Sequence, residues 1–97
     1  MSTELVGSRT FDLDSAWSLN EQVSVRPERF GALLYHFGTR RLSFLKSTKL
    51  LSVVRALATE PTARGACAVS GVTDDELPGY QQALETLATS DMIRERS

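Results

Sequence analysis

Apolar and polar residues alternate in three short stretches before residue 46. Residues 22–26 (QVSVR) alternate with two valines, residues 32–37 form an apolar run, and residues 41–45 alternate polar with apolar side chains. Such patterns are typical of strands with one buried face. Residues 38–40 contain the glycine that a hairpin loop favours, and residues 26–29, with proline second, favour a turn. The sequence therefore predicts a three-stranded antiparallel meander.

The spacing of apolar residues changes to three and four after residue 46, which indicates helices. Residues 49–58 carry a wide apolar stripe after Ser47 or Thr48, either of which can cap a helix. A second, short helix is predicted over residues 63–70. A third helix is predicted to start near Thr73 or Asp74, and residues 79–90 are its well-defined part. Three strands followed by three helices predict an α+β, winged-helix-like domain whose helices cover one face of the sheet.

The first 15 residues are polar and show no periodicity, so we expect residues 1–15 to form a mobile N-terminal arm. Phe11 and Leu13 could still dock on the domain. Trp17 is expected to close the end of the core. The folded domain is then expected to span residues 16–97.

Length and composition indicate one globular domain. The 97 residues are 41% apolar and 24% charged, which is enough apolar surface for a packed core. The sequence shows no membrane-spanning run and no signal peptide, so we expect a cytoplasmic protein that binds no membrane.

Catalytic and metal-binding patterns are not found. His36 and Cys67 are the only histidine and cysteine. Cys67 lies among small residues and is expected to be a buried apolar side chain, while His36 is expected to be structural. We therefore expect no enzyme, no metal site and no cofactor.

Charge is concentrated in the middle of the chain. Residues 22–55 carry seven basic side chains and one acidic one, whereas residues 1–21 and 56–97 are net negative. This pattern predicts a positive surface near the strands, which would attract an acidic partner. The same charges could equally serve only to solvate one face of the sheet.

The third predicted strand offers a binding mode of its own. If residues 41–45 lie at an edge of the sheet, their unpaired N–H and C=O groups could bind an extended peptide as an added strand. Selectivity would then come from alternate side chains.

The segment FGALLYHFGTRRLSFLK (residues 30–46), together with LDSAWSLNEQVSVRPE (residues 13–28), resembles the mycofactocin precursor-peptide chaperones. These belong to the RiPP recognition element family, which includes the pyrroloquinoline quinone peptide chaperone. The resemblance implies a winged-helix-like fold that binds the leader of a ribosomally made precursor peptide by strand addition. It also implies presentation of the peptide to a radical S-adenosylmethionine (SAM) maturase, with the iron–sulfur chemistry left to that partner.

Carried onto this chain, the resemblance places the peptide between the third strand and the third helix. Either Leu42 and Phe44 or Ser43 and Leu45 face the ligand, and the helix residues could equally belong to the core. Arg40 and Lys49 would add electrostatic steering. The expected peptide-binding residues are Arg41, Leu42, Ser43, Phe44, Leu45, Lys46, Tyr80, Leu84 and Leu87.

The alternative is a DNA-binding winged-helix regulator. Its recognition helix should carry basic residues, yet residues 73–93 contain no Lys or Arg and several acids. We therefore expect no nucleic-acid partner, and a monomer or weak homodimer.

Overall fold

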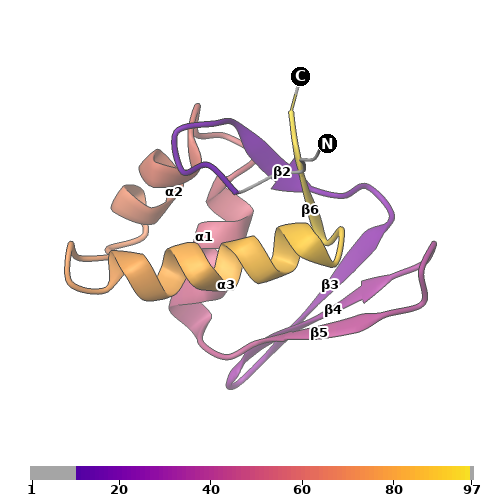
Figure 1. Cartoon of the computed structure of the whole chain (residues 1–97). Coiled ribbons are helices and arrows are strands. Elements are labelled where there is room, and N and C mark those ends of the chain that lie inside the picture. The colour runs from indigo at the N-terminus through magenta and orange to yellow at the C-terminus, as the bar shows by residue number, and fades with distance from the viewer. Residues whose placement is uncertain (1–10, 97) are drawn as a thin grey trace.

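The computed structural model describes residues 11–96 and has an α+β architecture. A three-stranded antiparallel sheet has the order β3-β4-β5, formed by β3 (Val23–Glu28), β4 (Gly31–His36) and β5 (Leu42–Leu45). Three helices follow: α1 (Thr48–Ala56), α2 (Ala63–Val69) and α3 (Leu77–Thr89). Figure 1 shows the helices above the sheet. The predicted meander followed by three helices is confirmed.

A second, two-stranded sheet ties the two ends of the described chain together. β2 (Trp17–Leu19) pairs with β6 (Ile93–Glu95), with Leu19 opposite Ile93. These strands were not predicted, because three residues are too few for alternation to indicate a strand.

The sequence-based turn at residues 26–29 is wrong, because β3 continues through Pro27 to Glu28. The N–H of Phe37 donates to the carbonyl of Gln22, which fixes the alternation of the ladder. At the position of Pro27 a backbone N–H would point away from β4. Proline therefore costs the sheet no hydrogen bond there, as is usual for proline on an edge strand.

Helix starts follow local chemistry. The hydroxyls of Ser47 and Thr62 accept from the N–H groups of Leu50 and Gly65, both at 3.0 Å. Of the two residues considered for the first cap, Ser47 is therefore the one that caps α1. α3 starts at Leu77, later than the predicted Thr73 or Asp74 and earlier than its predicted firm part. Pro78 is accommodated in the first turn, where a helix needs no N–H.

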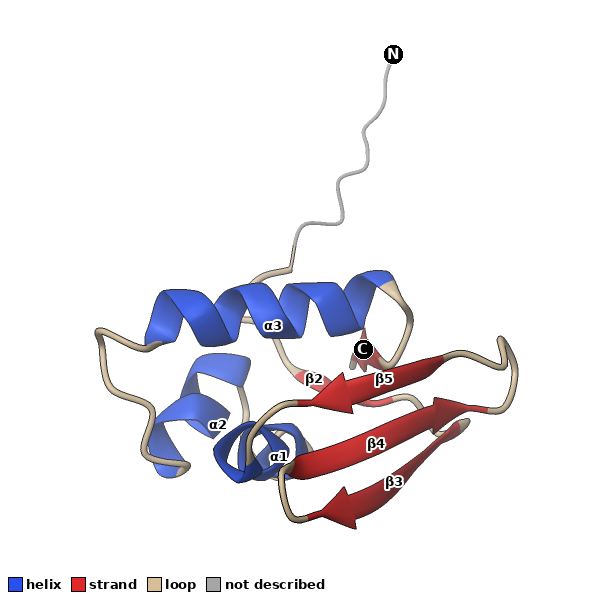
Figure 2. Ribbon diagram, turned by 90° about the horizontal axis from the view of Figure 1, so that it is seen from below, coloured by secondary structure: helices blue, strands red, loops and turns tan. Residues whose placement is uncertain are grey.

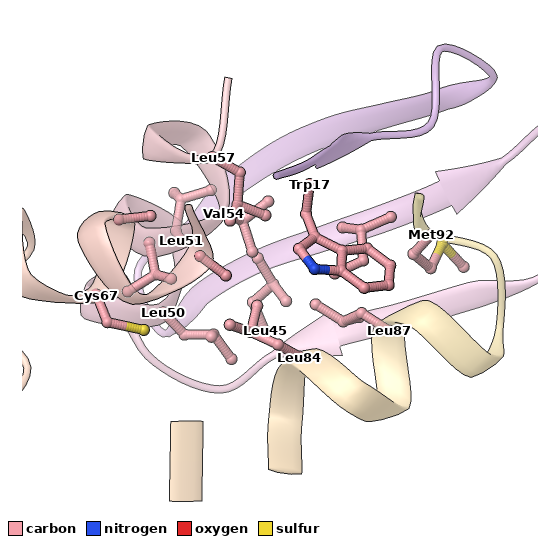
Figure 3. Packing of buried hydrophobic residues seen from close by; sticks show 14 of the residues in the cluster. Trp17, Leu45, Leu50, Leu51, Val54, Leu57, Cys67, Leu84, Leu87 and Met92 are labelled. Carbon is pink, nitrogen blue, oxygen red and sulfur yellow. The ribbon is translucent and has the colours of Figure 1, made fainter. Parts of the chain in front are cut away.

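The core lies between the inner face of the sheet and the three helices (Figure 3). Trp17 closes one end, as expected, at 7% exposure, and its indole N–H donates to the carbonyl of Asp12. Of the expected arm, residues 1–10 lie outside the described residues. Phe11 and Leu13 are buried, and the ring of Phe11 lies 4.8 Å from that of Trp17. The described part of the expected arm therefore packs against the core.

Candidate functional site

A groove of about 760 Å³ lies between β5 and α3. Figure 2, seen from below, places α3 alongside β5. One wall is the edge strand with the loop that follows it, the floor includes the first turn of α1, and the other wall is α3 with the turn before it. The lining residues are Leu42, Ser43, Phe44, Leu45, Lys46, Ser47, Leu50, Asp75, Glu76, Gly79, Tyr80, Ala83, Thr86 and Leu87.

β5 is an edge strand of this sheet, as the strand-addition hypothesis requires. The N–H of His36 donates to the carbonyl of Arg41 at 2.9 Å, and the register places Ser43 opposite Leu34. Because hydrogen-bonded and non-hydrogen-bonded pairs alternate, Arg41 and Ser43 point their backbone groups toward β4. The N–H and C=O groups of Leu42 and Phe44 therefore point outward from the sheet, and these two residues can hydrogen-bond an added strand.

The hairpin before β5 places this edge. The N–H of Arg40 donates to the carbonyl of His36 at 2.7 Å, and Arg40 has φ of 64°. A left-handed residue after a three-residue loop forms a bulge that fixes the register of the following strand. Arg40 thereby sets which residues of β5 face the groove.

The side chains of β5 divide between the two faces of the sheet. Leu45 is fully buried and Ser43 is half-buried, so this pair faces the core. Leu42 and Phe44 are 60% and 61% exposed and face outward. The question that the alternation left open is thus answered in favour of Leu42 and Phe44 as the exposed pair.

The other edge of the sheet, β3, is less available. Of its three outward positions, Val23 donates its N–H to the carbonyl of Asn20, and Pro27 has no N–H. Only Val25 keeps an outward donor. β5 is therefore the better edge for an added strand.

α3 gives the groove its second wall. Tyr80, Ala83 and Leu87 line it, whereas Leu84 does not and lies wholly in the core, to which Leu87, 4% exposed, also belongs. The expected helical wall is thus divided between groove and core. Ala83 lines the wall where the resemblance implied Leu84.

Basic residues differ in their relation to the groove. Lys46 lines it, whereas Arg40 and Arg41 are exposed outside it. The ammonium of Lys49 donates to Glu76 at 3.0 Å and to the carbonyl of Gly71 at 3.2 Å. Lys49 therefore ties α1 to the start of α3, and its charge is already paired.

The same contact perturbs both partners. A hydrogen bond from the N–H of Thr73, followed by that from Lys49, holds the pKa of Glu76 below its ordinary value. The hydrogen bond to Glu76 raises the pKa of Lys49. Both charged forms are stabilised at neutral pH, which fixes the turn at the mouth of the groove.

His36 has the structural role expected of it. It is 2% exposed, and its Nδ1 accepts from the N–H groups of Gly38 and Thr39, both at 3.0 Å. Nε2 is then the protonated nitrogen and lies 3.3 Å from a carboxylate oxygen of Asp91. The ring joins the β4–β5 hairpin to the turn after α3. Cys67 is 1% exposed, and burial raises the pKa of its thiol.

Several lining residues were missed by sequence reasoning. Leu50 was assigned to the core stripe of α1, although it forms part of the groove floor. Gly79 and Thr86 carry no functional group that would have indicated a site. They lie about two turns apart on the helix face that also carries Tyr80, Ala83 and Leu87. A helical-face argument from Tyr80 could have found them.

Residues 11–96 contain neither a metal-binding cluster nor a membrane-spanning helix. No cluster of three or more histidine, cysteine or acidic side chains in this part of the chain could hold a metal ion. None of the described helices is long and apolar enough to cross a membrane.

Comparison with known proteins shows which family the chain resembles. No solved structure matches the chain, so the likeness to winged helices stays a prediction. Peptide chaperone MftB of Mycolicibacterium smegmatis is 53% identical over 93 residues, covering 96% of this chain and 91% of that protein. The proteins of the same name from Mycobacterium ulcerans and Mycobacterium tuberculosis are 56% and 55% identical, covering 90% and 89% of this chain and 80% and 79% of the relatives. The model of the peptide chaperone MftB family matches residues 16–94. The chain therefore belongs to the peptide chaperone MftB family, which confirms the family resemblance seen in its sequence.

Proposed function

We propose that this protein binds the leader of a ribosomally made precursor peptide as a fourth strand on β5, under α3, and presents it to a radical SAM maturase in mycofactocin biosynthesis. The observation that carries the proposal is the open edge of β5 facing a groove. Leu42 and Phe44 present unpaired backbone groups there, and Tyr80, Ala83 and Leu87 offer apolar contacts opposite them.

The dimensions fit a short extended segment. The four residues of β5 span about 13 Å at the usual rise of a strand. The 13 residues of α3 span about 20 Å. A peptide of four or five residues would thus be covered by the helix along its whole paired length, which would exclude water from its backbone hydrogen bonds.

Charge would influence the approach of the peptide more than its final affinity. Arg41 and Lys46 are exposed at the two ends of β5 and pair with no carboxylate between residues 11 and 96. Such cations speed the arrival of an acidic leader and add salt dependence. The chain itself would perform no chemistry on the peptide, because reaction belongs to the maturase.

Isothermal titration calorimetry with the synthetic leader of the mycofactocin precursor tests the proposal. We expect saturable binding with a stoichiometry of one, and none to a duplex DNA of random sequence in a parallel titration. Backbone amide shifts should then concentrate on Leu42, Phe44 and the groove face of α3. Binding to DNA alone would instead support the winged-helix regulator, which the acidic residues 74–76 just before α3 disfavour.

A further inference from the structure

On the face of the sheet that points away from the helices, the part formed by β4 and β5 is apolar, whereas β3 adds Ser24 and Arg26 there. Leu33 lies opposite Phe44 and Tyr35 opposite Leu42, so the outward side chains of β4 and β5 are all apolar or aromatic. Phe30 and Phe37 continue this surface at its two ends, with ring centroids 6.3 Å from Phe44 and 5.3 Å from Tyr35. These six residues, Phe30, Leu33, Tyr35, Phe37, Leu42 and Phe44, are called the outer sheet face.

Four of the six are the most exposed aromatic and leucine side chains of the described protein. Phe30, Phe37, Leu42 and Phe44 are 48 to 61% exposed. Figure 2 looks onto this side, and all three helices lie on the opposite side in Figure 1. Contiguous exposed apolar surface of this kind marks an interaction site, because leaving it in water is unfavourable.

The surroundings of the outer sheet face indicate what covers it. Arg29 and Arg41 lie at its margins beside Phe30 and Leu42, and neither pairs with a carboxylate within residues 11–96. A second copy packed face to face would bring Arg26, Arg29 and Arg41 of each molecule together, and Glu28, which already pairs with Arg26, is the carboxylate that β3 adds on this side, so the contact is unfavourable. A partner with an apolar patch bordered by carboxylates is complementary.

The outer sheet face is also continuous with the groove, because Leu42 and Phe44 belong to both. In an added strand, every second side chain would project on the same side as these two residues. The bound leader would therefore extend the outer sheet face by one strand. A partner docked there would touch chaperone and peptide at once.

Resting on the proposed function, we infer that the outer sheet face is the docking surface for the maturase, and that the maturase binds the peptide-loaded chaperone more tightly than the empty one. Because coupling between two ligands is reciprocal, the maturase also raises the affinity for the leader by the same factor. We expect a factor of about five or more, the lower end of typical couplings between sites.

The test uses the full chain, the leader peptide and the purified maturase. Leu33→Thr with Phe37→Ser removes apolar surface from the face without touching a groove residue, and Arg29→Glu reverses a marginal charge. Val69→Ser is the matched control, since Val69 is 63% exposed on α2, away from the sheet. Circular dichroism and thermal unfolding establish that each variant is folded.

We expect the Leu33/Phe37 variant to bind the leader as the wild type does, and the maturase at least about tenfold more weakly, the effect of losing roughly 1.4 kcal/mol. Arg29→Glu should weaken maturase binding most at low salt, and Val69→Ser should change nothing. Unchanged maturase binding by the Leu33/Phe37 variant, while the wild type binds the leader, would overturn the docking surface alone. Wild-type protein that binds no leader would overturn the proposed function instead.

Two further outcomes would also overturn the inference. Equal affinity of the maturase for loaded and empty wild-type chaperone would contradict the composite surface. Sedimentation could show that the wild type is a dimer and the Leu33/Phe37 variant a monomer. If both also bound the maturase normally, a second copy of this chain, and not the maturase, would cover the outer sheet face.

Discussion

Proline at position 44 provides a sharp test of strand addition. The ladder leaves four outward backbone groups on β5, the N–H and C=O of Leu42 and of Phe44. Phe44→Pro removes one of the two donors. The peptide carbonyl that this donor served would stay unpaired under α3, at a cost of about 1–3 kcal/mol. We therefore expect the Kd for the leader to rise by about 5- to 150-fold.

Two other variants separate this effect from the loss of the ring and from unfolding. Phe44→Ala also lacks the phenyl group but keeps the N–H, so the ratio of the two Kd values isolates the hydrogen bond. Ser43→Pro removes an N–H that bonds β4, opposite Leu34, and should lower the melting temperature more than Phe44→Pro.

Isothermal titration calorimetry gives the affinities, and thermal unfolding by circular dichroism gives the stabilities. If folded Phe44→Pro and Phe44→Ala bind the leader equally well, the peptide does not pair with this edge. The reasoning from the ladder would then be refuted, whatever the affinity of the wild type.

Three further predictions follow from the described contacts. Gly31→Ala would place a methyl group 2.0 Å from the carbonyl oxygen of Leu45 and should lower the melting temperature strongly, whereas Gly79→Ala meets no atom within 4 Å and should stabilise α3 by about 0.5–1 kcal/mol. Differential scanning calorimetry should therefore show melting temperatures shifted in opposite directions. A Gly31→Ala protein as stable as the wild type would contradict the packing around Gly31. Because the pKa of Glu76 is lowered in the folded protein, its contribution to stability is present above its pKa in the unfolded chain and is lost as the pH falls through the lower folded value. In Glu76→Gln the melting temperature should therefore fall less steeply with pH below about pH 4 than in the wild type. An unchanged pH dependence of the melting temperature would refute this. Reversing Arg41 and Lys46 to glutamate should slow leader association most at low salt in stopped-flow measurements, and a salt-independent change would argue against steering.

The sequence predicted the fold well where local patterns determine structure. The caps Ser47 and Thr62 are local, since a hydroxyl and an N–H three residues later suffice. The β2–β6 pair depends on residues almost 80 positions apart, such as Trp17 and Glu95, and no local pattern specifies such a pairing.

The site was predicted in part for the same reason. Alternation indicated that Leu42 and Phe44 share one face, but only the structure shows which face is exposed. Leu84 and Leu87 occupy the same helical stripe and both pack in the core, and the rotation of α3 over β5 decides that only Leu87 also reaches the groove. Lys49 carried a charge for steering in the sequence, whereas the turn before α3 brings Glu76 to it.

Pro27 makes the two edges of the sheet unequal as sites for a further strand. A small sheet with two complete edges could pair β5 of one molecule with β3 of the next, and each addition would leave a fresh end on which growth could continue. On β3, proline at one outward position and the Val23–Asn20 hydrogen bond at another leave a single donor. Growth through that edge is disfavoured. If a guest strand adds to β5 as proposed, its pairing should therefore stop there and not propagate through β3.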